Sequence, residues 1–192
     1  LIWQADPAFW NRHAPVLFPN VGKYYGGHFT YNGKAYPMGQ HGFARDTEFE
    51  QIAAGEDFVT YRLCADEESK KKYPFDFVLE ITHRLENNRL SVEWNVKNVD
   101  DKEMYFTIGG HPAFNVNILP DTDFEDYSLV FKEGIETLSY ILIDAENGTA
   151  LTDKTHKLEL TNSKYALKKD MFDKDALIFD NGQIEWVGLA LP

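Results

Sequence analysis

The sequence has 192 residues, of which 43% are hydrophobic and 15% aromatic, so it can bury one substantial core, and we expect a single domain over residues 1–192. Its formal net charge of -12 at pH 7 opposes binding to nucleic acids and to anionic membrane surfaces, because both attract Lys and Arg. The single cysteine, Cys64, excludes an internal disulfide, and no apolar run approaches the roughly 20 residues that cross a bilayer. We therefore expect a soluble, cytoplasmic protein with a small, uncharged partner.

In the first half of the chain, two patterns predict β-hairpins. Asn32-Gly33 is a strong turn signal because both residues tolerate the positive φ of tight turns, and it joins predicted strands at 28–31 and 34–36. Apolar and polar residues alternate over residues 77–97 and are interrupted at 86–89, which predicts two long antiparallel strands.

The remaining elements are also short and mostly extended. Further strands are predicted at residues 58–64, 104–108, 127–131, 157–160, 177–179 and 183–191. The charged run 67–72 is interpreted as a solvated hairpin tip, the acidic stretch 119–126 as a loop, and 164–172 as the one short helix. Evenly spaced short strands favour an all-β sandwich or barrel over alternating strands and helices.

Four short segments combine glycine or proline with a histidine, arginine or aromatic residue, and loops of this kind beside rigid strands often carry function. The segments are Asn11-Arg12-His13-Ala14-Pro15, Gln40-His41-Gly42-Phe43-Ala44-Arg45, Gly109-Gly110-His111-Pro112-Ala113-Phe114-Asn115 and Lys174-Asp175-Ala176-Leu177. His111 follows a predicted strand and is flanked by glycines and Pro112, which would hold its imidazole at the strand end. His41 and His111 are candidates for hydrogen bonding or proton transfer, whereas His83 lies on the apolar face of a strand and is interpreted as a core residue whose ring nitrogens have hydrogen-bond partners, that is, a satisfied core residue.

Other kinds of site lack their sequence patterns. No His-x-His, His-x-x-x-His or Glu-x-x-His spacing indicates a metal site. Cys64 lies inside a predicted strand, no serine stands in a Gly-x-Ser-x-Gly turn, and no phosphate-binding glycine loop is present. We therefore expect neither a metal nor an organic cofactor.

Four motifs together resemble the bacterial branch of the aldose 1-epimerase (galactose mutarotase) family in order and spacing. They are Trp3-Gln4-Ala5-Asp6-Pro7-Ala8-Phe9-Trp10, Arg12-His13-Ala14-Pro15-Val16-Leu17-Phe18-Pro19, His41-Gly42-Phe43-Ala44-Arg45 and Gly109-Gly110-His111-Pro112-Ala113-Phe114-Asn115. The similarity spans the chain from Leu1 to about Asp180. It implies an all-β fold, an antiparallel β-supersandwich, whose open face binds a sugar and interconverts its α and β anomers.

The chemistry of this reaction needs one acid and one base. Opening a cyclic hemiacetal removes a proton from the anomeric hydroxyl while another is delivered to the ring oxygen. The resemblance implies that His111 is the general acid at the ring oxygen, that His41 hydrogen-bonds the sugar, and that Asp175 grips the sugar hydroxyls. Lys23 stands where the family typically has an arginine, so the charge is kept but the planar fork is lost. Arg45 is a further candidate for sugar binding.

The candidate base departs from the family pattern. The family has a glutamate close to the C-terminus in an Ile-Glu-Pro-Trp-like motif, whereas this sequence offers Ile184-Glu185-Trp186, without the proline and directly after the Asp175 segment. Glu185 is the candidate base, and the alternative is that it simply belongs to the strand 183–191. The sequence also starts inside the family pattern, so we expect it to be incomplete at both ends. If it is complete as written, the acid–base pair is expected to be lost.

Three functions therefore stay open. The first is a hexose 1-epimerase acting on a neutral sugar, and the second is a carbohydrate-binding protein without turnover on the same scaffold. The third is a hexose-phosphate 1-epimerase, which needs a basic cluster for which Lys23 and Arg45 are the two candidates. For each function the partner is a small sugar, and we expect a monomer or a homodimer.

Overall fold

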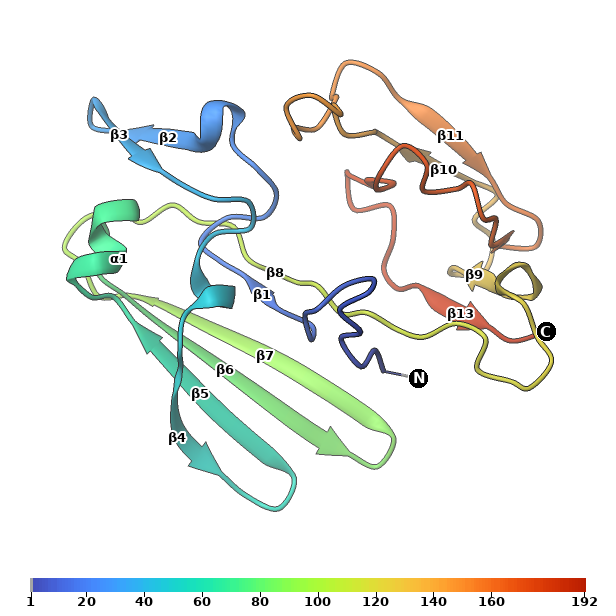
Figure 1. Ribbon diagram of the computed structural model, residues 1–192, viewed down its shortest axis with the longest axis horizontal. Helices are drawn as coiled ribbons and strands as arrows, with labels where there is room; N and C mark the ends of the chain where they lie inside the picture. The colour runs from blue at the N-terminus through green and yellow to red at the C-terminus, as the bar shows by residue number, and fades with distance from the viewer. Residues whose placement is uncertain (1) are drawn as a thin grey trace. The chain divides into compact units, whose positions relative to one another are not determined.

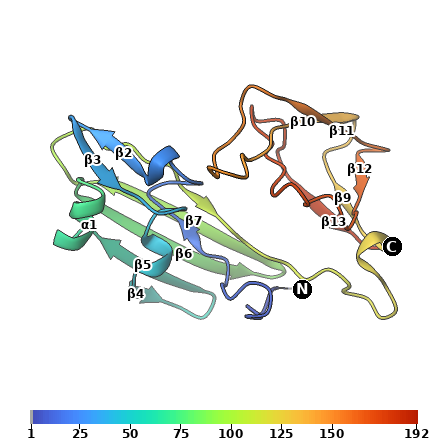
Figure 2. The same ribbon diagram turned by 45° about the horizontal axis from the view of Figure 1, so that its top comes forward.

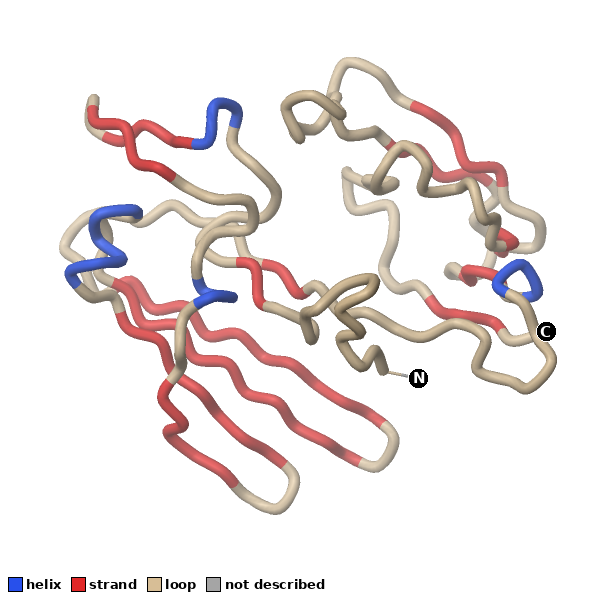
Figure 3. The backbone as a smooth tube through the Cα atoms, in the orientation of Figure 1, coloured by secondary structure: helices blue, strands red, loops and turns tan. Residues whose placement is uncertain are grey.

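The computed structural model describes residues 2–192 and is built almost entirely of strands and loops (Figure 3). Its elements are β1 (Val16–Leu17), η1 (Tyr25–Gly27), β2 (His28–Tyr31), β3 (Lys34–Pro37), η2 (Ala44–Asp46), β4 (Glu50–Ala54), β5 (Phe58–Cys64), α1 (Glu67–Lys72), β6 (Phe77–Glu86), β7 (Arg89–Asn98), β8 (Gly109–Gly110), η3 (Phe124–Asp126), β9 (Ser128–Val130), β10 (Thr137–Tyr140), β11 (His156–Glu159), β12 (Lys164–Ala166) and β13 (Gly188–Ala190), where η marks a 3-10 turn. The expectation of an all-β protein is confirmed. No helix within residues 2–192 is long and apolar enough to span a membrane.

The chain divides into two compact units, which we describe one at a time. One unit is Ala14–His111, and the other joins the segment up to His13 to the segment Pro112–Pro192.

The unit Ala14–His111 is built around an antiparallel sheet in the order β4-β5-β6-β7. Figure 1 shows its strands side by side, with α1 at one end and the β4–β5 and β6–β7 turns at the other. The predicted strands at 58–64 and 77–97 are confirmed, and β6 pairs with β7 over its full length from Phe77–Asn98 to Glu86–Arg89. The predicted hairpin around Asn32-Gly33 is also confirmed, with β2 and β3 paired from His28–Pro37 to Tyr31–Lys34.

One face of this sheet carries the core of the unit. Leu79, Phe77 and Ile81 point to this face at alternate positions of β6 and are 0%, 1% and 7% exposed. They pack against buried residues from outside the sheet, namely Phe18, Met38, Ala44, Tyr73 and Phe75. The Phe18 ring contacts the Phe77 ring edge-on at 5.1 Å between centroids. Each fully buried side chain of this size contributes about 1.5–3 kcal/mol, so this cluster anchors the loop that contains Phe18.

The apolar face continues toward the β6–β7 turn, where it is exposed. Leu85 and Leu90 pair across the two strands and are 58% and 55% exposed, and Val92, opposite His83, is 44% exposed. His83 is half-buried, and its Nδ1 is buried without a hydrogen-bond partner among the described residues. The interpretation of His83 as a satisfied core residue is therefore wrong, because the packing that would surround it covers only the other end of the sheet.

Residues 67–72 form the α-helix α1 and not a hairpin tip. Asp66 is its N-cap: the Ser69 N–H donates to Asp66 Oδ1 (2.7 Å), and the Asp66 N–H donates to Ser69 Oγ (2.9 Å). Glu67 and Glu68 lie in the first turn and three lysines in the last, which suits the helix dipole. The charged run is therefore helical because its ends are capped, a signal that the charge pattern alone hides.

The strand predicted at residues 104–108 does not form. The segment is held by single bonds: the Thr107 N–H donates to the Pro19 carbonyl (2.9 Å), and the Tyr73 hydroxyl donates to the Tyr105 carbonyl (2.9 Å). Its apolar alternation is real, but in the described chain no neighbouring strand pairs with it. Gly109–Gly110, directly after it, does pair as β8 with β1.

The unit that contains residues 112–192 has two small sheets. β9 pairs with β12 on one side and β13 on the other, and β10 pairs with β11 (Figure 2). Phe131, Leu138 and Leu158 are the buried centre of its core. The predicted strands at 127–131 and 157–160 are thereby confirmed to within a residue or two.

Three predictions in this unit need correction. Residues 164–172 are not a helix, because β12 occupies 164–166 and turns follow. Residues 177–179 make a single bridge, between Ile178 and Ile141, and the strand predicted at 183–191 is limited to β13. Pairing with β9, rather than local propensity, decides where β12 and β13 start and stop.

Candidate functional site

His41 and His111 are brought together by one short stretch of backbone, residues 15–22. β1 and β8 pair antiparallel, and directly after β8 the His111 N–H donates to the Pro15 carbonyl (3.1 Å). Farther along the same stretch, the His41 N–H donates to the Gly22 carbonyl (2.7 Å). His41 and His111 are 70 positions apart in the sequence, but their backbone N–H groups bond to the two ends of this one segment.

The backbone at His41 is tightly constrained. His41 and Gly42 both have positive φ, 66° and 71°, which is uncommon for a residue other than glycine, asparagine or aspartate. The N–H groups of Phe43 and Ala44 both donate to the Phe18 carbonyl at 3.1 Å. A Cβ at Gly42 would lie 2.1 Å from that same carbonyl oxygen, so only glycine fits there. Phe18 is fully buried in the core, and the core thereby fixes the His41 loop.

The two imidazole rings lie close together. Their centroids are 5.7 Å apart, with 56° between the ring planes. The Gly22 N–H donates to Nδ1 of His41 (3.0 Å). Because Nδ1 accepts this bond, a neutral His41 carries its proton on Nε2, which makes Nε2 a hydrogen-bond donor. His111 is exposed, as a group that meets a ligand must be.

Electrostatics favour the uncharged form of His41. Burial lowers the pKa of His41 below its ordinary value of 6.5, and the charges of Arg45 and His111 lower it further. A protonated Nδ1 would also lose the bond from the Gly22 N–H. At neutral pH His41 is therefore a neutral imidazole with a fixed tautomer, suited to donating a hydrogen bond.

Arg45 and Lys23 are the basic residues predicted for this site. Arg45 lies in η2, its side chain is 19% exposed, and its Nε is 3.7 Å from the Asp46 carboxylate, too far for a hydrogen bond. That Nε is buried and has no hydrogen-bond partner among the described residues. Lys23 follows Gly22 directly and is exposed. Both cations thus belong to the unit that holds the two histidines, and Arg45 acts on His41 through its charge.

Asp175 lies in the other unit, in a turn before Ile178. Its φ is 70°, its N–H donates to the Phe172 carbonyl (3.0 Å), and its Oδ1 accepts from the Ala176 N–H (2.6 Å). The side chain is exposed. Its sequence neighbourhood is therefore a tight turn that presents a carboxylate to solvent.

Glu185, the candidate base, also lies in that unit, in a bend before β13. Its Oε1 accepts a hydrogen bond from Nζ of Lys132 (2.6 Å), and its side chain is 64% exposed. The alternative prediction, that Glu185 lies in a strand, is wrong, since β13 begins at Gly188. The ion pair with Lys132 occupies this oxygen of the carboxylate that is proposed to act as the base.

Sequence reasoning missed the residues that position the histidines. Pro15, Phe18 and Gly22 act through backbone atoms, and β1 is too short to give a periodic signal. The glycine after His41 was the available clue, because a glycine in such a segment allows close approach of another stretch of backbone. Within residues 2–192, no group of three or more His, Cys, Asp or Glu side chains gathers as metal ligands do.

Comparison with known proteins gives the chain its family. The family model described as aldose 1-epimerase matches residues 1–184, so Glu185 lies just beyond the match. The protein named "Protein LacX, plasmid" from Lactococcus lactis subsp. lactis is 34% identical over 186 residues, which cover 93% of this chain and 62% of that protein. The chain thus spans less than two thirds of the length of this relative.

Solved structures agree with this assignment. A galactose mutarotase related enzyme from Lactobacillus acidophilus has a TM-score of 0.91 and 37% identity, over 99% of this chain and 62% of its own. A galactose mutarotase-like protein from Lactobacillus casei has a TM-score of 0.85 and 34% identity, over 100% of this chain and 65% of its own. The predicted galactose mutarotase-like fold is confirmed, and the chain belongs to the aldose 1-epimerase family.

Proposed function

We propose that this protein binds a hexose beside His41 and His111 and interconverts its α and β anomers by acid–base ring opening. The observation that carries the proposal is the pair of imidazoles 5.7 Å apart, one neutral with a fixed tautomer and the other exposed. Family membership supports a sugar as the partner. The neutral hexose, the individual roles and the turnover are our proposals.

The two histidines take different roles. His111 donates a proton to the ring oxygen as the ring C–O bond breaks, and takes it back when the ring closes on the other face of the carbonyl. His41 stays neutral and donates a hydrogen bond from Nε2 to a sugar oxygen, which orients the ring. Arg45 supports these separate roles, because its positive charge disfavours protonation of His41 and so keeps that imidazole neutral.

The base must be a group that takes the proton from the anomeric hydroxyl. We assign this role to Glu185 and assign the binding of sugar hydroxyls to Asp175. The Glu185 carboxylate is bonded to Lys132, so it must exchange this partner for the anomeric hydroxyl before it can accept a proton. This step is the most demanding part of the proposal.

The same ion pair favours a second candidate function. If Glu185 stays paired with Lys132, His111 has no base to work with and the protein binds the sugar without turning it over. Hydrogen bonds from His41 and stacking on aromatic residues do not depend on a base. A carbohydrate-binding protein on this fold is therefore the alternative.

Polarimetry separates the two candidates. Freshly dissolved α-glucose and α-galactose would be followed with the protein, with His111→Ala and Glu185→Gln variants, and with a buffer blank. The control is His28→Ala, because His28 is exposed and its Nδ1 lies within hydrogen-bonding distance of the Gly26 carbonyl in its own turn (3.1 Å). We expect faster equilibration than the blank, lost in His111→Ala and kept in His28→Ala.

Each variant has a defined meaning. Loss of the rate in Glu185→Gln assigns the base, and an unchanged rate in that variant refutes the assignment. A wild-type rate equal to the blank, for protein whose circular dichroism shows a folded β-sheet, excludes the epimerase. Sugar binding measured on the same sample by calorimetry then identifies the carbohydrate-binding alternative.

A further inference from the structure

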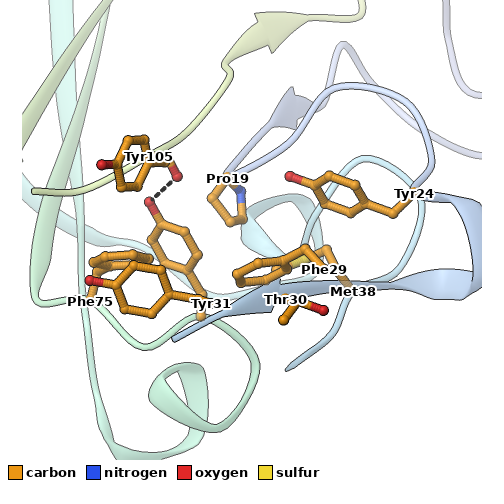
Figure 4. A pocket seen from close by; sticks show the side chains of 9 residues that line it. Pro19, Tyr24, Phe29, Thr30, Tyr31, Met38, Phe75 and Tyr105 are labelled. Atoms are coloured by element: carbon orange, nitrogen blue, oxygen red, sulfur yellow. Dashed lines mark hydrogen bonds between the residues drawn. The ribbon is translucent and has the colours of Figure 1, made fainter. Parts of the chain in front are cut away.

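The unit Ala14–His111 contains a cavity of about 250 Å³ that includes neither histidine. Figure 4 shows aromatic side chains around it, coming from the β2–β3 hairpin, from the segment before β6 and from the segment after β7. It is lined by Pro19, Tyr24, Phe29, Thr30, Tyr31, Met38, Tyr73, Phe75 and Tyr105. The volume is below the roughly 300–1,000 Å³ of sites for drug-sized ligands, so it suits a single small ring.

The cavity walls are held in place by contacts among the rings themselves. Phe75 lies 4.8 Å from Tyr31 and 4.8 Å from Tyr73, measured between ring centroids. Tyr24 lies 5.7 Å from Phe29, and the Tyr73 hydroxyl donates to the Tyr105 carbonyl (2.9 Å). Tyr73 is 2% exposed and Phe75 1%, so the floor of the cavity is part of the core. The cavity is therefore a built feature of the core.

The polar groups of the cavity are hydroxyls. Tyr24, Thr30 and Tyr31 each bring a hydroxyl that can both donate and accept, and no charged side chain lines the cavity. Burial raises the pKa of Tyr24 above its ordinary value, so its hydroxyl keeps its proton at neutral pH. A neutral ligand with several hydroxyls and an apolar ring face matches this lining.

Two lysine ammonium groups lie over rings at or next to this cavity. Nζ of Lys102 lies 5.5 Å from the centre of the Phe75 ring, and Nζ of Lys34 lies 4.9 Å from that of Tyr36, which stacks on Phe29. A cationic ligand, the other class that aromatic cages attract, would be repelled by these two nearby charges. The lining therefore favours a neutral ring over an organic cation.

We propose that this aromatic cavity is a second carbohydrate site, which binds one neutral pyranose ring by stacking and by hydrogen bonds to tyrosine and threonine hydroxyls. It shares the loop of residues 18–24 with the histidine site: Pro19 and Tyr24 line the cavity, and Gly22 between them bonds to His41. The site does not depend on ring opening. It would hold a sugar ring that the histidines do not process.

The test uses methyl α-D-glucopyranoside and methyl β-D-galactopyranoside. Their anomeric oxygens are capped, so the rings cannot open and binding is separated from the epimerase reaction. Saturation-transfer NMR on the protein would detect contact between aromatic protons and the sugar C–H groups. We expect transfer from the wild-type protein, and a dissociation constant about tenfold weaker in Tyr24→Phe, which loses one hydroxyl.

Matched variants decide where the glycoside sits. Tyr31→Ala removes a wall and is expected to abolish the transfer that persists in the His111→Ala variant, whereas Tyr25→Ala is the control, because Tyr25 is 74% exposed and does not line the cavity. His111→Ala is expected to leave the transfer from the aromatic cavity intact, because His111 does not line it. Tyr24→Phe keeps the test valid if Tyr31→Ala does not fold.

Three results would overturn the site. They are no transfer from folded wild-type protein, transfer that Tyr24→Phe and Tyr31→Ala leave unchanged, and transfer lost only in His111→Ala. Displacement of the glycoside by tetramethylammonium at similar concentration would likewise contradict a neutral-ring site. Failure of mutarotation in polarimetry affects none of these measurements.

Discussion

Gly22 and His41 are joined by two hydrogen bonds that run in opposite directions. The His41 N–H donates to the Gly22 carbonyl, and the Gly22 N–H donates to Nδ1 of the His41 ring. The first bond fixes the loop and the second fixes the ring, so backbone and side chain are set by one glycine. The second bond also sets the tautomer of a neutral His41, because the nitrogen that accepts it, Nδ1, carries no proton.

The titration of His41 follows from this arrangement. We expect NMR of its ring protons to show a pKa below the ordinary value of 6.5. Arg45→Gln is expected to raise that pKa, though not to the ordinary value, because burial is the larger cause and remains. Lys23→Gln, a cation of the same region that is not among the causes, is the control. An unchanged titration in Arg45→Gln would contradict the electrostatic role of Arg45.

The same shift gives stability a pH dependence. The unfolded chain takes up a proton at His41 near pH 6.5, whereas the folded protein does so only at lower pH. The unfolded state thus binds more protons in that window, so the free energy of unfolding falls as pH drops below about 6.5. Urea unfolding at several pH values is the measurement, and His41→Gln is expected to remove this part of the slope.

A methyl group added at Gly42 is expected to lower the free energy of unfolding strongly. In Gly42→Ala the new Cβ would meet the Phe18 carbonyl at 2.1 Å, so the loop or the core must move, and we expect a loss of about 3–5 kcal/mol. Gly33→Ala is the matched control, since Gly33 also has positive φ but nothing within 4 Å, and only about 1–2 kcal/mol of backbone strain is expected. Equal losses in urea unfolding would show that the close approach to Phe18 is unimportant.

Glu80 connects three strands of the sheet on the face opposite the core. Its carboxylate accepts from Arg62 on β5 and from Asn95 and Lys97 on β7. The hydrogen bond from Arg62 is the main cause that lowers the pKa of Glu80. This stabilisation is present above the ordinary glutamate range near pH 4 and is lost as pH falls through the lowered value.

We therefore expect Glu80→Gln to flatten the acid side of the stability profile. At neutral pH the variant is less stable than the wild type, and the difference narrows as the pH approaches the lowered pKa. Stability from pH 2 to 7, measured by chemical denaturation, tests this expectation. A difference that stays constant over the whole range would mean that the charge of Glu80 is not what matters.

Leu79 and Leu85 test how the core is distributed along β6. Leu79 is fully buried, and Leu79→Ala is expected to cost about 2–5 kcal/mol. Leu85 points to the same face but is 58% exposed, and Leu85→Ala is expected to cost under about 1 kcal/mol. Similar losses in thermal unfolding would show that the exposed end of the sheet is packed in solution.

The strands β5, β6 and β7 could be predicted because each is long enough to show a recognisable strand pattern. The β2–β3 hairpin could be predicted from its turn signal, Asn32-Gly33. Residues 104–108 show the limit of this reasoning. Their alternation is as clear, but a strand also needs a partner, and the described chain supplies Pro19 and Tyr73 as single contacts instead. Residues 164–172 fail for the opposite reason, since pairing with β9 outweighs a weak helical pattern.

For the candidate site, the sequence proposed side chains but gave no sign of the backbone that supports them. His41 and His111 are brought together by the pairing of β1 with β8 and by bonds to Pro15 and Gly22, all of which use backbone atoms that any residue has. Nor does the sequence show that Glu185 pairs with Lys132, because the partners are 53 positions apart. Backbone positioning leaves a trace only where a glycine is required, as at Gly42.

The core packs over only one end of the β4–β7 sheet, so local stability should differ between the two ends of β6. Amide protons of β6 near Phe77 and Leu79 lie over the core and should exchange with solvent deuterium only on global unfolding. Those near Leu85, at the exposed turn, open by local fraying at much lower free energy. Protection of the amide protons against exchange should therefore decline along β6 from Phe77 to Leu85. We expect the sheet to unfold first at its turns and last beside α1.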